Sequence, residues 1–392
     1  MKFIRTLFSF ITLIFLILFA HSTFAQWFRS QSHKDSLDLT FSGTKINPYA
    51  VEFDSTGSWK ISAYLDTYYA GYSDTINQSG FAKFPTIAPR NNQFGLNIIQ
   101  VSARYNSKNF RGTMTVFGGD CAITAWSPVL NYVQEANMGF RIVKKLWLDA
   151  GFFRTHIGLE SIQPRENIAL SLATTTYFEP YFLSGAKLTW QQSDRLTFQV
   201  NAFNSFNTFV ETNKNKALGF STSYSPTQKS TFSFSTIWSN EMPAGSEIVD
   251  HHRWYNNLCW TYKSNKISMG WEINYGKQYH TSLNPSLHTA TVWSGLGTIK
   301  YRFHPQWATY GRGEYFQDLD EMLTGPIWNE NHTTVGVNIR GITCGFEYKP
   351  IPNSFVRMET RLLHNQKEHI FEENGHSSEN RKEIIFGMGL WF

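Results

Sequence analysis

Charged side chains occur at two places in this sequence where their types and spacing could act on an ion. One group lies in a single segment, residues 156–180, and comprises Glu160, Arg165, Glu166 and Glu179. The second group recurs at every other position and comprises Arg312, Glu314, Arg357, Glu359 and Arg361. If the two groups faced each other across an aqueous opening, opposed acids and bases would create a transverse field, and a ring of one sign would select ions of the other.

The same charges have a second interpretation, in which they pair with one another and hold the segment in place. Ionisable groups inside a membrane usually pair or line a cavity, and they often do both. The residue types alone leave both interpretations open. If Arg357 and Arg361 line the opening, replacing them with Ala should shift ion selectivity toward cations, which a reversal potential would measure.

Catalytic chemistry has weaker support. One group of side chains could suggest a hydrolase, and it comprises Asp250, His251, His252, His280 and His288. Histidines in a loop are far more often solvated than catalytic, and a catalytic site must also meet geometric tests. The three cysteines have neither metal-ligand spacing nor the pattern of a disulfide framework: Cys121, Cys259 and Cys344. We therefore expect no enzymatic activity, no cofactor and no metal site.

The elements that would position these charges are β-strands. Alternation of apolar and polar residues with a period of two predicts sixteen segments: 58–72, 94–106, 109–118, 131–143, 146–155, 181–191, 195–204, 216–225, 230–240, 253–262, 266–276, 289–303, 306–317, 333–349, 354–364 and 382–392. In segment 354–364 the apolar positions Met358 and Leu362 alternate with the charged ones. An arginine facing lipid would cost ~2–4 kcal/mol at the bilayer midplane, so the charged face must line a lumen.

The connections between these segments alternate in length. Short turns such as 144–145 alternate with long loops such as 156–180, as expected for periplasmic turns and external loops of an outer-membrane barrel. The pattern predicts an all-β, transmembrane antiparallel barrel of about sixteen strands, with fourteen as the alternative. A barrel of that size is too wide for wall side chains to fill and leaves an aqueous channel.

The two ends of the chain support the same compartment. Lys2 and Arg5 precede an apolar stretch, and Thr23-Phe24-Ala25 forms a small-x-small cleavage site. This is the pattern of a secretory signal, and the stretch is shorter than the ~20 residues of a membrane-spanning helix. We expect residues 1–25 to be removed, 26–57 to form a periplasmic extension and 58–392 to form the barrel.

Composition is compatible with a barrel but does not require one. Aromatic residues make up 16% of the chain and charged residues 17%, and barrels place Trp and Tyr in girdles at both membrane interfaces. Removing Lys2 and Arg5 from 35 basic residues leaves 33 against 30 acidic ones, a formal net charge of +3. This balance is too mild to indicate nucleic-acid binding.

The segment around the third long loop carries a family resemblance. It reads Gly-Phe-Phe-Arg-Thr-His-Ile-Gly-Leu-Glu from Gly151 to Glu160, with Glu-Asn, Ser and Glu-Pro positions after it. This run resembles the OmpL-like β-barrel porins, which occur widely in Bacteroidetes-type and other Gram-negative envelopes. The positions that match the family, besides Glu160 and Glu166, are Thr155, Gly158, Asn167, Ser171 and Pro180.

The resemblance implies a porin, a water-filled barrel for passive diffusion of ions and small hydrophilic solutes, with loop 156–180 folded inward to narrow the pore. The expected partners are outer-membrane lipid and lipopolysaccharide, the barrel-assembly machinery during biogenesis, the solutes themselves and, as an open question, further copies of the chain. The alternative is a structural or partner-binding barrel with a plugged lumen, in which loops such as 318–332 and 365–381 act as an adhesin or receptor surface. A barrel hydrolase is the third class.

Overall fold

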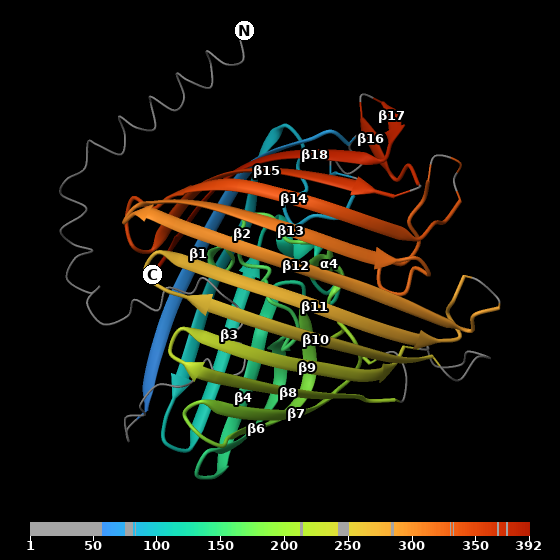
Figure 1. Ribbon diagram of the computed structural model, residues 1–392. Coiled ribbons are helices and arrows are strands. Elements are labelled where there is room, and N and C mark those ends of the chain that lie inside the picture. The colour runs from blue at the N-terminus through green and yellow to red at the C-terminus, as the bar shows by residue number, and fades with distance from the viewer. Residues whose placement is uncertain are drawn as a thin grey trace. The chain divides into compact units, whose positions relative to one another are not determined.

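A closed antiparallel β-barrel of sixteen strands forms the described part of the chain (Figure 1). The computed structural model describes residues 57–74, 81–82, 84–211, 215–241, 251–283, 286–329, 331, 333–366, 368–373 and 375–392. β1 pairs with both β2 and β18, so the first and last strands close the ring. The predicted fold class is therefore confirmed, with sixteen strands rather than fourteen. The predicted signal segment and nearly all of the predicted extension lie outside the described residues.

Each predicted segment corresponds to one barrel strand. The strands are β1 (Ser58–Tyr72), β2 (Gln93–Asn106), β3 (Phe110–Gly118), β4 (Val133–Val143), β5 (Leu146–Arg154), β6 (Phe182–Gln191), β7 (Leu196–Phe203), β8 (Ala217–Thr227), β9 (Ser230–Asn240), β10 (His252–Lys263), β11 (Ile267–Tyr279), β12 (Thr289–His304), β13 (Trp307–Asp318), β14 (Val337–Tyr348), β15 (Ser354–Asn365) and β18 (Asn380–Trp391). The largest shift is at β14, which begins at Val337 rather than at 333. A separate hairpin of β16 (Phe371–Glu373) and β17 (His376–Ser378) lies in the last loop and was not anticipated.

Side chains alternate between the two faces of each strand, as the sequence pattern predicts. On β15, Met358 and Leu362 are exposed on the outer face, while Arg357, Glu359 and Arg361 are buried on the inner face. The orientation of this charged ladder toward the lumen is confirmed. The barrel thus presents apolar groups outward and ionisable groups inward, the arrangement that lipid requires.

Among the described residues, helical structure occurs only in the loops. α3 (Asp120–Thr124) lies between β3 and β4, and the 3-10 turn η2 (Pro164–Glu166) and α4 (Thr174–Phe178) lie between β5 and β6. Within the described residues, no helix is long and apolar enough to cross a bilayer.

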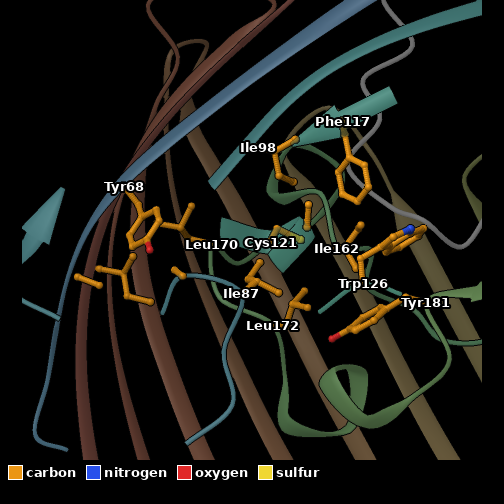
Figure 2. Packing of buried hydrophobic residues seen from close by; sticks show 14 of the residues in the cluster. Tyr68, Ile87, Ile98, Phe117, Cys121, Trp126, Ile162, Leu170, Leu172 and Tyr181 are labelled. Atoms are coloured by element: carbon orange, nitrogen blue, oxygen red, sulfur yellow. The ribbon is translucent and has the colours of Figure 1, made fainter. Parts of the chain in front are cut away.

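Apolar side chains from several loops pack inside the barrel. One cluster joins Ile87, Cys121, Trp126, Leu170 and Leu172, which come from the first three loops, to the inner wall of β1–β3 (Figure 2). A second cluster contains Ile157 between β5 and β6, Phe206 after β7 and Met322 after β13. The interior is therefore partly filled by loops, which the sequence pattern did not indicate.

Candidate functional site

The connection between β5 and β6, residues 155–181, is here called loop 3. It lies inside the barrel, and almost all of its residues are buried. It hydrogen-bonds to β10, β11, β13 and β15, which are separated in the barrel from β5 and β6, the strands that loop 3 connects. Loop 3 therefore crosses the lumen rather than lying along one side.

Carboxylates hold loop 3 by accepting hydrogen bonds from its backbone. Glu359 accepts the N–H groups of Leu170 (2.7 Å) and Ser171 (3.1 Å). Glu314 accepts the N–H of Thr174 at 2.6 Å. Glu272 accepts the N–H of Leu159 at 2.7 Å. Each bond is charge-assisted, and such bonds are about twice as strong as neutral ones.

Arginines of the wall complete these attachments. Arg312, which is 2% exposed, donates to Glu160 at 2.9 Å and to the Ser171 carbonyl at 2.7 Å. Arg357 donates to the carbonyls of Pro164 (2.8 Å) and Ala169 (3.2 Å). Because guanidinium carries five donors in a planar fork, one side chain can bind a carboxylate and a carbonyl together.

The wall charges also neutralise one another. Arg361 binds both oxygens of Glu314, each at 2.9 Å. Glu347 accepts from both Lys300 (2.9 Å) and Arg357 (2.7 Å). These ion pairs are almost fully buried, so the pairing interpretation of the charges describes their geometry in this structure.

Loop 3 is also braced internally at positions that match the family pattern. Asn167 bonds through its side chain to the backbone N–H and carbonyl of Ser161, at 2.8 and 2.6 Å. The Thr155 hydroxyl accepts the N–H of Ile157 at 3.0 Å. Gly158 has φ +88°, and a Cβ there would lie 2.5 Å from Glu179 Oε2, so only glycine fits without strain. Pro180 is buried at the end of the loop.

Two charges of loop 3 contact groups outside the predicted wall set. Burial alone would raise the pKa of Glu166, but the ion pair with Arg154 lowers it to about 2. Burial lowers the pKa of Arg165, and its guanidinium lies 4.5 Å from the ring centroid of Tyr64. Arg165 is half-buried, which distinguishes it from the wall arginines.

The structure brings only some of the predicted site residues into contact across the lumen. Glu160 meets Arg312, and the backbone of loop 3 meets Glu314, Arg357 and Glu359. Glu179 instead accepts the Tyr255 hydroxyl at 2.8 Å. Four residues that contact loop 3 or the wall charges were not among the site residues expected from the sequence: Arg154, Tyr255, Glu272 and Glu347. Glu272 carried a usable signal, because it alternates with outward Trp271 and Ile273 on one strand.

The histidine group does not form a recognisable catalytic arrangement among the described residues. Asp250 lies outside them. The His252 ring stacks on Trp238 with centroids 4.8 Å apart, and His280 and His288 are exposed and joined through their backbones. No group of three metal-ligating side chains occurs in the part of the chain that the structure describes.

Comparisons with known proteins agree with this architecture. The family described as "Putative beta-barrel porin-2, OmpL-like" matches residues 58–392. Among solved structures, the chain resembles an anion-selective porin from Comamonas acidovorans, with a TM-score of 0.56 and 8% identity over 86% of this chain and 100% of the other. DcaP, an outer-membrane channel of Acinetobacter baumannii, has a TM-score of 0.55 and 9% identity over 87% of this chain and 99% of the other. OmpF of Salmonella typhi has a TM-score of 0.55 and 11% identity over 87% of this chain and 99% of the other.

No curated protein matches the sequence significantly. At 8–11% identity the solved structures establish the fold alone, whereas the family match spans the entire barrel. The chain therefore belongs to the OmpL-like family of β-barrel porins, and it forms a porin barrel of the outer membrane.

Proposed function

We propose that the chain is a channel for passive diffusion of ions and small hydrophilic solutes, in which loop 3 sets the bore. The observation that carries this proposal is the attachment of loop 3, which starts from β5 and ends at β6, to carboxylates of β11, β13 and β15 through its backbone N–H groups. The proposed constriction has charged groups on two sides. Those of loop 3 are Glu160, Arg165, Glu166 and Glu179, and those of the wall are Arg312, Glu314, Arg357, Glu359 and Arg361.

The attachment through Glu359 gives a direct test. Its carboxylate accepts four hydrogen bonds, from the Leu170 and Ser171 N–H groups and the Ser171 and Tyr310 hydroxyls. Glu359→Gln keeps the shape but removes the charge and one acceptor, so the loop should be held less firmly. We expect single-channel recordings of this variant to show larger or more frequent changes of conductance level than the wild type.

A matched control comes from Glu379→Gln, because Glu379 lies in the last loop and pairs with His369 at 3.6 Å. This control should leave the conductance record unchanged. If Glu359→Gln and Glu379→Gln both behave as the wild type does, loop 3 does not set the bore through this contact.

A second candidate function has specific support in the packing of the loops. Apolar residues of loop 3 and of the loops after β1, β3 and β7 form clusters with the inner wall, as a plugged, partner-binding barrel would require. The β16–β17 hairpin at the rim offers an external surface (Figure 1). A correctly folded barrel that carries no current but binds a cell-surface partner would favour this function.

The same proposal covers the N-terminal residues, the partners of the barrel and its lack of enzymatic activity. Residues 1–25 act as a cleaved secretory signal and 26–57 as a periplasmic extension. The barrel is inserted by the assembly machinery and contacts lipopolysaccharide, and a homo-oligomer of the chain is compatible with the same proposal. It has no enzymatic activity, and the absence of hydrolysis of ester and peptide substrates by the purified barrel would support this.

A further inference from the structure

The inner wall formed by β1–β6 carries positive charge that the rest of the protein does not neutralise. Arg104 on β2 and Lys187 on β6 occupy inward-facing positions and are half-buried. Arg165 of loop 3 projects toward the same wall, over Tyr64 of β1. Tyr64 pairs with Gln100, four residues before Arg104 on β2.

The strand register connects these cations across the wall. Asn106 lies two residues after Arg104 on the same face of β2, and it is opposite Arg111 on β3. From Arg111 the row of paired residues continues through Gly139 on β4 and Asp149 on β5 to Lys187 on β6. Gly139 leaves the space that Arg111 needs to reach across β4, since a Cβ there would lie 2.1 Å from Asp149 Oδ1. Residues in diagonal positions of neighbouring strands lie within reach of long side chains. A solute moving along this wall would meet the cations in succession.

Local carboxylates are too few to cancel these charges. Asp149 is occupied by a bidentate contact with Arg111, at 2.6 and 2.5 Å, and Glu166 by Arg154. Two other acids of this region remain: Glu135, which is half-buried on the inner face of β4, and Asp66, which is fully buried on the inner face of β1 and accepts hydrogen bonds from Tyr64 and Asn97. The three cations Arg104, Arg165 and Lys187 against the two acids Glu135 and Asp66 leave a net formal charge of +1.

The three cations lack ion pairs within the part of the chain that the structure describes. The Arg104 Nε is buried and has no hydrogen-bond partner. Arg165 donates its Nε–H to Gln163 at 2.8 Å, a neutral acceptor. The Lys187 ammonium lies 3.8 Å from the ring centroid of Phe153. Each therefore retains donors that an anion could use.

The acids on the opposite wall do not offset this charge where water can reach it. Glu272, Glu314 and Glu359 are buried and bonded to the backbone of loop 3. The ionisable surface accessible to a solute on the β1–β6 side is thus dominated by cations. Guanidinium binds carboxylate and phosphate groups through paired hydrogen bonds.

We propose that Arg104, Arg165 and Lys187 form a binding track for small oxyanions, carrying carboxylate or phosphate groups, along the β1–β6 wall, and that the channel prefers anions. This inference rests on the proposed channel function. It assigns a substrate class and a path to that channel, and it places the selectivity away from the buried ion pairs of β13–β15.

The test is the reversal potential of the purified barrel in a planar bilayer under a KCl gradient, followed by addition of inorganic phosphate. The wild type should show the sign of anion preference, and phosphate should reduce the chloride current. In each of Arg104→Gln and Lys187→Gln the chloride-to-potassium permeability ratio should fall by about fivefold, as loss of one screened contact between a unit charge and an ion would give. In the double variant the ratio should fall further, and phosphate should inhibit less. The single variants are measured as well, so the test does not depend on folding of the double variant.

Arg340→Gln is the matched control, because Arg340 is exposed on the outer face of β14, next to outward-facing Ile342 in the alternation of that strand. It should leave selectivity unchanged. A channel that conducts with cation preference, or whose selectivity is the same in the wild type and the Arg104 and Lys187 variants, would overturn the track while leaving the channel function in place. A folded barrel without any current would instead overturn the channel function, and the track with it.

Discussion

Glu166 is a residue through which loop 3 should respond to pH. Its pKa is lowered from 4.5 to about 2 by Arg154. A lowered pKa in the folded state contributes stability above the pKa of the unfolded state, and that stability is lost as the pH falls through the folded pKa. The Glu166–Arg154 contact should therefore be complete at neutral pH and weaken between about pH 4.5 and pH 2.

We accordingly expect the contribution of this contact to the wild-type thermal unfolding temperature to stay constant from pH 7 to pH 5. The unfolding temperature should then fall as the pH approaches 2. Glu166→Gln should be less stable than the wild type at pH 7, and the difference should shrink in acid. Circular dichroism melts at a series of pH values would measure this. A difference that stays constant down to pH 2 would contradict the assignment.

Gly158 is the second residue with a specific requirement. Its φ of +88° and the nearby Glu179 carboxylate exclude a side chain, and a residue with a Cβ pays roughly 1–2 kcal/mol in the left-handed region. Gly158→Ala should lower the unfolding free energy by about that amount. Gly297→Ala is the control, since nothing lies within 4 Å of a Cβ there. Equal unfolding midpoints for the two variants would show that loop 3 does not need this conformation.

At the scale of elements, the orientation of β15 predicts that its outer face contacts lipid. Met358 is 60% exposed on the outer face, between the inward Arg357 and Glu359. If that face contacts lipid near the bilayer midplane, Met358→Arg should destabilise the barrel by ~2–4 kcal/mol. Asn353→Arg, in the exposed turn between β14 and β15, should have little effect. Folding equilibria in lipid vesicles would measure both, and similar values would place Met358 outside the membrane.

The strands were predictable from sequence because their signal is local. Alternation along 354–364 identifies both β15 and its inner face without knowledge of any other strand. The three-residue strands β16 and β17 are too short for such a pattern. The packing of Ile87 and Trp126 inside the barrel was equally inaccessible, because a few apolar residues in a loop do not reveal which surface covers them.

The candidate site was predictable only in its composition. Glu160 and the β15 ladder were recognised as ionisable groups of a loop and a wall. Their partners depend on the closed barrel: Glu160 meets Arg312 across 152 residues of sequence, and Glu272 meets Leu159 across 113. The sequence pattern specifies a face of a strand, but it does not specify which loop crosses the lumen to reach that face.

At the scale of the whole molecule, the N-terminal segment makes a prediction that is independent of the barrel. The charged residues at 2 and 5, the apolar stretch and Thr23-Phe24-Ala25 predict cleavage after Ala25. Intact-mass analysis of protein purified from outer membranes should give a chain that begins at Gln26. A mass that retains residues 1–25 would show that the segment is not removed.

The barrel as a whole combines a wall typical of porins with a lumen that its own loops occupy in part. We infer that water and ions still pass through this lumen. The most direct measurement is the single-channel conductance of the purified, refolded protein in a planar bilayer. Stable, reproducible conductance steps are the result we predict. A barrel that is folded by circular dichroism, inserts into the bilayer and gives no steps would contradict the claim and favour a plugged, partner-binding protein.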